Sequence, residues 1–111
     1  MSDARIVLST AGSREEAEKI GNALVERRLA ACVNIVPQVK SIYRWQGKVE
    51  QAEELLLIIK TTAQRFESVR DLLQELHSYE LPECVCIEVG NGSDAYLKWL
   101  EGSVGADWEP S

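Results

Sequence analysis

The sequence predicts an α+β fold in which two helices pack on one face of a four-stranded sheet. Apolar runs rich in Val, Ile and Leu mark four strands. Two stretches with apolar residues at helical spacing interrupt these strands, giving the order β-α-β-β-α-β. The second and third strands are long and are joined by the turn Gln46-Gly47. Right-handed crossovers then place both helices on the same face, which is the ferredoxin-like sandwich.

The first strand and the first helix have clear boundaries. Residues 5–9 form a short apolar strand that ends near Gly12. Ser13 and Glu16 have the spacing of a capping box, in which the serine oxygen accepts from a free amide and the glutamate reaches back. Apolar residues then recur at intervals of three and four, so we expect a helix over residues 13–29.

A long hairpin follows. Residues 32–45 and 49–60 are rich in β-branched and aromatic side chains and are separated by Gln46-Gly47, whose glycine tolerates a positive φ. Pro37 interrupts the first arm. Because proline cannot donate to a strand ladder, we expect a bulge or an edge position there.

The second helix is expected to start at a threonine cap and to end before a proline. Thr61 or Thr62 can supply the cap, and Pro82 displaces the residues before it from the α region, so the helix ends near His77. Residues 84–89 then form the last strand, which we expect in the core.

The 111 residues are expected to form one domain. After the last strand, Ser93 can cap a short C-terminal helix. The domain is assigned to residues 1–102, and residues 103–111 are expected to be a loose tail because they have no apolar periodicity.

The strands indicate that a second chain covers the sheet. Residues 6–8 and 55–59 are apolar on both sides of their strands, which is typical of a sheet buried on both faces. Two helices cover one face only. In addition, hairpin arms of about 12 residues span roughly 40 Å and overhang a domain with a radius of gyration of ~13 Å. We therefore expect an obligate homo-oligomer.

Composition excludes several classes of protein. The formal net charge of −6 opposes binding to nucleic acid or to an anionic membrane surface. No apolar run approaches the ~18 residues of a membrane span, and the first residues do not have the pattern of a secretory signal. Three cysteines fit free thiols in a reducing compartment, so a cytoplasmic location is expected. No nucleophile set or phosphate loop predicts an enzyme.

Several motifs together resemble the CutA family of divalent-cation tolerance proteins. The motifs run in the family's order from about residue 6 to residue 100, nearly the whole chain. They are Arg28-Leu-Ala-Ala-Cys-Val-Asn34, Pro37, Ser41-Ile-Tyr-Arg-Trp-Gln-Gly-Lys48, Glu54, Ile59-Lys-Thr61, His77-x-Tyr79-x-x-Pro82-Glu83 and Tyr96-x-x-Trp99.

The resemblance implies a homotrimer of ferredoxin-like subunits, similar to the PII signalling proteins, with the sheets facing inward. It implies binding or sensing of a divalent metal at subunit clefts, with copper preferred and weakly bound, and no enzymatic reaction. The alternative is a stable trimeric scaffold or PII-like module that binds a protein partner or a small metabolite, with metal contact incidental.

The metal site proposed for some family members maps onto His77, Glu83 and, more weakly, Ser9, which stands where those members have a cysteine. A histidine and a carboxylate are suitable ligands for Cu or Zn, but two ligands from one chain hold a metal weakly. The alternatives are a histidine that stabilises the end of a helix, a solvated carboxylate and a strand-end hydroxyl.

Cys84 and Cys86 form a Cys-x-Cys pair on one face of the last strand. Two thiols there can bind a soft metal, but packing is the favoured interpretation because free cysteine behaves as a small apolar residue. Glu88 shares this face, so we expect the face to look toward a subunit interface.

Four further residues are candidates for a ligand cleft or an interface. Tyr43 and Trp45 alternate onto one face near the hairpin tip, and such aromatic residues are enriched in interfaces. Lys60 either faces an anion in a cleft or merely ends its strand. Tyr79 belongs to the same motif as His77.

Overall fold

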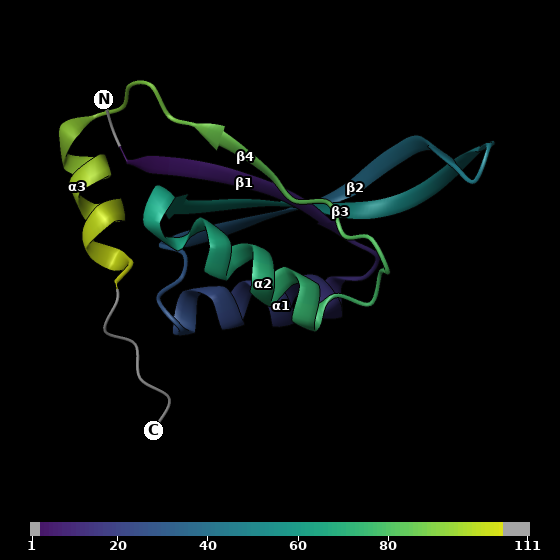
Figure 1. The fold of residues 1–111 in the computed structure, drawn as a ribbon, viewed down its shortest axis with the longest axis horizontal. Helices are drawn as coiled ribbons and strands as arrows, with labels where there is room; N and C mark the ends of the chain where they lie inside the picture. The colour runs from purple at the N-terminus through teal and green to yellow at the C-terminus, as the bar shows by residue number, and fades with distance from the viewer. Residues whose placement is uncertain (1–2, 106–111) are drawn as a thin grey trace.

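The computed structural model describes residues 3–105 of the chain and has the predicted order of elements (Figure 1). The elements are β1 (Ala4–Ala11), α1 (Arg14–Glu26), β2 (Cys32–Trp45), β3 (Lys48–Thr62), a 3₁₀ turn (Ala63–Arg65), α2 (Phe66–Leu76), β4 (Val85–Glu88) and α3 (Asp94–Ser103).

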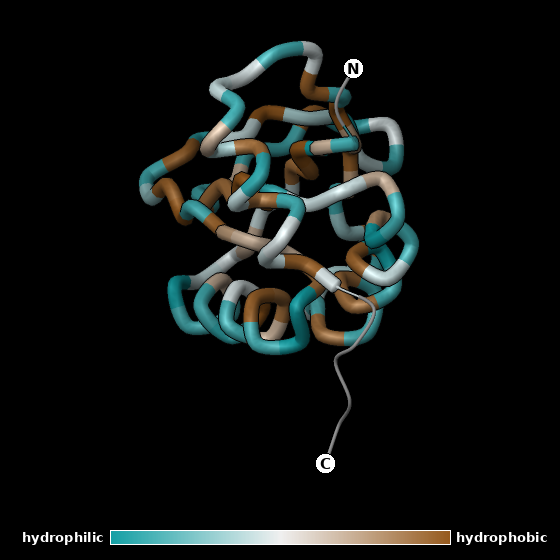
Figure 2. Tube along the Cα trace, turned by 90° about the vertical axis from the view of Figure 1, so that its left-hand side faces the viewer, coloured by the Kyte–Doolittle hydropathy of each residue, from teal (hydrophilic) through white to brown (hydrophobic). Residues whose placement is uncertain are grey.

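The four strands form one antiparallel sheet in the order β2-β3-β1-β4. Helices α1 and α2 lie side by side on one face of it, as expected from right-handed crossovers (Figure 1). The core between the two layers joins Val7 of β1 and Leu57 and Ile59 of β3 to Leu24 of α1 and Leu73 of α2. In Figure 2 both helices lie at the bottom and show apolar and polar segments in turn along their coils. The ferredoxin-like α+β fold is confirmed.

The caps of the helices differ in part from the expectation. Ser13 caps α1, because its Oγ accepts from the amide of Glu16 over 3.1 Å. The carboxylate of Glu16 accepts instead from the amide of Ser78, 3.0 Å away. Helix α1 ends at Glu26, earlier than expected, and Arg28 follows in the left-handed region with φ 58°.

The expectation that a threonine caps the second helix is wrong. The hydroxyl of Thr61 donates to the carbonyl of Leu29 over 2.6 Å, so it ties β3 to the segment after α1. Thr62 precedes the 3₁₀ turn and makes no capping bond through its side chain. That turn, and not a side-chain cap, leads into α2.

The hairpin has the predicted turn and bulge. Gln46 and Gly47 both have positive φ, 52° and 81°, as a tight turn between twisted strands requires. Val36 pairs with Leu56 but Val39 pairs with Glu54, so two residues of β2, Pro37 and Gln38, lie opposite one residue of β3. Gln38 has a φ of 62°. A bulge of this kind bends its strand and shifts by one residue the alternation of side chains between the two faces of the sheet.

The face of the sheet opposite α1 and α2 is open over much of its area. Side chains alternate along β3, and because Leu57 and Ile59 lie in the core, Leu56 and Ile58 point to the opposite face. On β4, Val85 is 50% exposed and Ile87 is 44% exposed. The expectation that β4 is a core strand is therefore wrong for a single subunit.

The first residues of the predicted tail, 103–105, are described by the structure. Helix α3 runs to Ser103, Val104 is buried, and the amide of Gly105 donates to the carbonyl of Arg28 over 3.2 Å. The start of the expected tail thus packs against the segment after α1. Residues 106–111, the rest of that tail, lie outside the described residues.

Candidate functional site

A cavity of about 730 Å³ opens where the hairpin leaves the body of the subunit. Its walls are Thr10 at the end of β1, Glu54 of β3, residues 41–45 of β2 and residues 79–83 of the segment between α2 and β4. Glu54 lies on the same face of β3 as Leu56 and Ile58, so the cavity adjoins the open face of the sheet.

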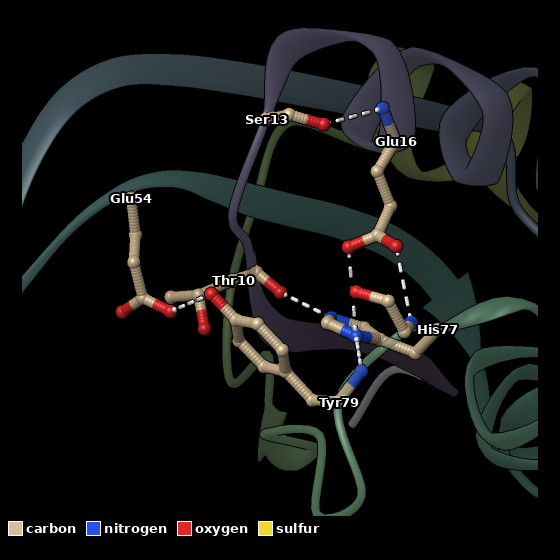
Figure 3. Close-up of polar contacts among 7 residues, drawn as sticks. Thr10, Ser13, Glu16, Glu54, His77 and Tyr79 are labelled. Carbon is tan, nitrogen blue, oxygen red and sulfur yellow. Dashed lines mark hydrogen bonds and ion pairs between the residues drawn. The ribbon is translucent and has the colours of Figure 1, made fainter.

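His77 lies directly behind the wall of this cavity (Figure 3). Its ring forms hydrogen bonds with the backbone of Thr10 and Tyr79, two residues that line the cavity. Its Nδ1 accepts from the amide of Tyr79 over 3.1 Å, so the ring proton sits on Nε2, which donates to the carbonyl of Thr10 over 2.6 Å. The side chain has 0% exposure. Both ring nitrogens of the neutral imidazole are therefore engaged, and neither offers a free lone pair.

Glu16 joins the same segment to helix α1 (Figure 3). Its Oε2 accepts from the amide of Ser78, and its Oε1 lies 3.7 Å from Nδ1 of His77. The first turn of α1 is a favourable place for a carboxylate, because the free amides there carry partial positive charge. One acidic side chain thus fixes the start of the cavity wall.

Tyr79 and Glu54 form the second polar contact of the site. The Tyr79 hydroxyl donates to Oε2 of Glu54 over 2.9 Å. Burial, together with this hydrogen bond and the charge of Glu54, raises the pKa of Tyr79 to about 12. The phenol therefore stays protonated at neutral pH and remains a donor. Gly12 makes room for it, since a Cβ at that position would lie 2.9 Å from the Tyr79 hydroxyl oxygen.

The three positions of the expected metal site have different surroundings. Glu83 is exposed and lines the cavity, whereas His77 lies behind the wall. Ser9 is fully buried, pairs with Leu57 on the core face of the sheet, and its Oγ has no hydrogen-bond partner among residues 3–105. In that same range, no three His, Cys, Asp or Glu residues lie close enough together to hold a metal ion.

The cleft candidates separate into two groups. Tyr43, Trp45 and Tyr79 all line the cavity. Lys60 lies elsewhere: it is paired with Ile6 and Cys32 across the sheet, and its Nζ is 5.8 Å from the centre of the Tyr96 ring.

The Cys-x-Cys pair lies on the helix side of the sheet. Cys86 pairs with the core residue Val7, and Cys84 packs against the core. The face of β4 that carries Cys84 and Cys86 is therefore the one on which the helices pack, opposite the open face of the sheet. Burial raises the pKa of both thiols above the ordinary value. The neighbouring Cys86 thiol raises the pKa of Cys84 further. A raised pKa disfavours the thiolate that a metal requires.

Comparison with known proteins identifies the family. The family model described as CutA1 divalent ion tolerance protein matches residues 5–103. The divalent-cation tolerance protein CutA of Thermus thermophilus is 49% identical over 100 residues, which cover 90% of this chain and 97% of that relative. This chain belongs to the CutA1 family. The resemblance seen in the motifs is thus confirmed.

Solved CutA structures share the fold closely. CutA from Xylella fastidiosa has a TM-score of 0.91 at 40% identity, covering 94% of this chain and 100% of that one. The periplasmic CutA from Archaeoglobus fulgidus has a TM-score of 0.89 at 41% identity, covering 92% and 99%. Within residues 3–105 of this CutA1 chain, no helix is both long and apolar enough to span a membrane.

Sequence reasoning did not assign three residues of the CutA1 site. Thr10 enters through its backbone carbonyl, which leaves no trace in residue type. The pattern predicts Glu16 as a capping residue, whereas its carboxylate contacts the amide of Ser78 and the ring of His77. Glu54 had a signal, because it is a charged residue directly before the apolar run 55–59, and it turns out to be only 8% exposed.

Proposed function

We propose that this CutA1 protein acts in divalent-cation tolerance as a homotrimer that binds a divalent metal, with copper preferred, at clefts between subunits. The observation that supports it best is the acidic cavity beside the open sheet face. Three carboxylates, Glu54, Glu80 and Glu83, line it against one guanidinium, Arg44. A surplus of negative charge raises the local concentration of cations.

The trimer explains the open face. Exposed Val85 and Ile87, with Leu56 and Ile58, form an apolar surface that a single subunit leaves in contact with water. Cyclic assembly with the sheets inward buries it in every subunit equally. The cavity adjoins this face, so assembly places a second subunit near each cavity.

Metal binding at this site is weak and relies first on Glu83. Glu83 is exposed at the cavity and keeps both oxygens free for a cation within the described part of the chain. His77 becomes a ligand only if Nδ1 releases the amide of Tyr79, which costs a partly buried hydrogen bond of about 1 kcal/mol. Water or a second subunit supplies the remaining ligands.

A Cu(II) competition titration tests the metal proposal. We expect Glu83→Gln to weaken Cu(II) binding about fivefold or more relative to the wild type. Glu26→Gln is the matched control, because Glu26 is an exposed carboxylate on α1, outside the cavity walls. Equal affinities of the two variants would remove Glu83 from the site.

A PII-like module that binds a small molecule is the second candidate function. It is favoured by the size and lining of the cavity, since about 730 Å³ walled by Tyr43, Trp45 and Tyr79 exceeds what a metal ion needs. A cytoplasmic location agrees with Cys32, Cys84 and Cys86, which are all free thiols.

A further inference from the structure

We infer that the cavity binds an organic ammonium ion, with Glu54 as its counter-ion and the rings of Tyr43, Trp45 and Tyr79 around its positive end. This inference rests on the second proposed function, that the cavity takes a small molecule, and it names the chemistry of that molecule. It does not depend on metal binding at Glu83.

Glu54 is the first observation. Its side chain lies in the wall of the cavity, and the residue is only 8% exposed. Within residues 3–105 no Lys or Arg forms an ion pair with it, and its one hydrogen bond is the Tyr79 hydroxyl at Oε2. Figure 3 shows this pair, which is joined to His77 through the backbone amide of Tyr79. A carboxylate so far removed from water is costly unless a cation neutralises it, and Oε1 is left to receive one.

The aromatic wall is the second observation. After the bulge, Val39 pairs with Glu54 and Tyr43 pairs with Glu50, so Tyr43 and Trp45 share the face of Glu54. The ring of Tyr79 reaches the same place from the other side and touches Glu54 through its hydroxyl. Aromatic faces attract cations, and most strongly where water is excluded.

Charge and size select among ligands. Glu80 and Glu83 add two exposed carboxylates to the cavity, while Arg44 supplies the one cationic side chain of the lining. This balance opposes phosphates and other anions. A volume of about 730 Å³ fits a molecule of several heavy atoms and not a bare ion. An amine that is positive at neutral pH and carries an apolar body satisfies both conditions.

Three probes of one shape but different charge test the inference. Phenethylammonium is a cation, phenethyl alcohol is neutral and phenylacetate is an anion. Each is titrated into the assembled full-length protein, and binding is followed by calorimetry and by the NMR signal of the Trp45 indole. We expect the cation to bind about tenfold or more tightly than the alcohol, and the anion not to bind.

Substitution of Glu54 isolates the counter-ion. Glu54→Gln removes the charge and keeps an oxygen that can accept from Tyr79. We expect it to lower affinity for phenethylammonium about tenfold and to leave affinity for the alcohol unchanged. Glu53→Gln is the matched control, since Glu53 is exposed and points to the opposite face of β3. Trp45→Leu is expected to lower the affinity for phenethylammonium more than the affinity for phenethyl alcohol.

The outcomes separate the two proposals. Equal binding of cation and alcohol, or equal loss in Glu54→Gln and Glu53→Gln, would overturn the ammonium site and leave a small-molecule cavity. If none of the three probes binds, both the ammonium site and the small-molecule function fall. Cation-selective binding that depends on Glu54 supports both.

Discussion

Nδ1 of His77 accepts a hydrogen bond from the backbone amide of Tyr79 over 3.1 Å, and the two rings lie 4.5 Å apart. Because Nε2 of the same imidazole is bound to the carbonyl of Thr10, the histidine joins the end of β1 to the segment that walls the cavity. In a single subunit His77 therefore acts as a structural connection.

Removal of this histidine is expected to destabilise the fold without any metal. His77→Ala loses one buried and one partly buried hydrogen bond and leaves a cavity, so we expect the free energy of unfolding to fall by about 2–4 kcal/mol. Urea denaturation in the presence of a chelator, at one fixed protein concentration, measures this. A variant as stable as the wild type under those conditions would contradict the structural role.

Tyr79 is expected to make stability depend on alkaline pH. Its pKa is raised from 10.0 to about 12, so the folded state holds this proton more tightly than the unfolded state. The contribution of the Tyr79 proton to the free energy of unfolding is fully present below pH 10 and is lost as the pH rises from 10 to about 12. Tyr79→Phe should remove this part of the decline. In addition, the difference between the two phenolate absorbance titrations should show one tyrosine that titrates near 12, whereas a difference centred at 10 contradicts the prediction.

Gly12 and Tyr79 are expected to be energetically coupled. A Cβ at Gly12 would lie 2.9 Å from the Tyr79 hydroxyl oxygen, so Gly12→Ala must displace the phenol from Glu54. We expect a cost of about 1 kcal/mol. The cost should shrink in the Tyr79→Phe background, where the remaining ring atoms are 3.6 Å away. A double-mutant cycle of unfolding free energies measures the coupling, and additive costs would show that the two residues do not interact.

A charge on the open sheet face is expected to dissociate the assembly. Ile87→Lys places an ammonium group on the surface that we assign to the trimer interface. Val25→Lys is matched to it, because Val25 is 43% exposed against 44% for Ile87 but lies on α1. Sedimentation should show the wild type and Val25→Lys at three times the mass of one chain and Ile87→Lys at a lower mass. Identical masses for both variants would place the interface elsewhere.

Local sequence signals predicted most of the fold. The cap at Ser13, the turn at Gln46-Gly47 and the bulge near Pro37 depend on a few neighbouring residues, and each lies where its pattern placed it. The left-handed backbone of Arg28 was not predicted, because glycine is the usual residue at such a helix end. Here the amides of Leu29 and Ala30, which both donate to the carbonyl of Leu24, stabilise this conformation with a larger residue.

Long-range contacts could not be read from the sequence. Tyr79 and Glu54 lie 25 positions apart, and Glu16 and Ser78 lie 62 apart, so no local pattern links them. Thr61 has the residue type of a helix cap, yet its hydroxyl bonds to Leu29 because β3 extends past the expected end of the strand. Sequence motifs pointed to several residues of the site, whereas the contacts between those residues depend on the tertiary fold.

The bulge in β2 determines the character of the cavity wall. If the residues of β2 paired one to one with β3 from Val36 onward, Gln38 would lie opposite Glu54. The basic residues Lys40 and Arg44 would then share the face of Glu54, and the aromatic residues Tyr43 and Trp45 would turn away from it. The same sequence in regular register would therefore present a basic wall in place of an aromatic, cation-attracting one, whereas deletion of Gln38 would keep Val39 opposite Glu54 and leave the aromatic wall in place. In this fold, the charge of the ligand that the cavity accepts depends on strand register as well as on the identity of the side chains.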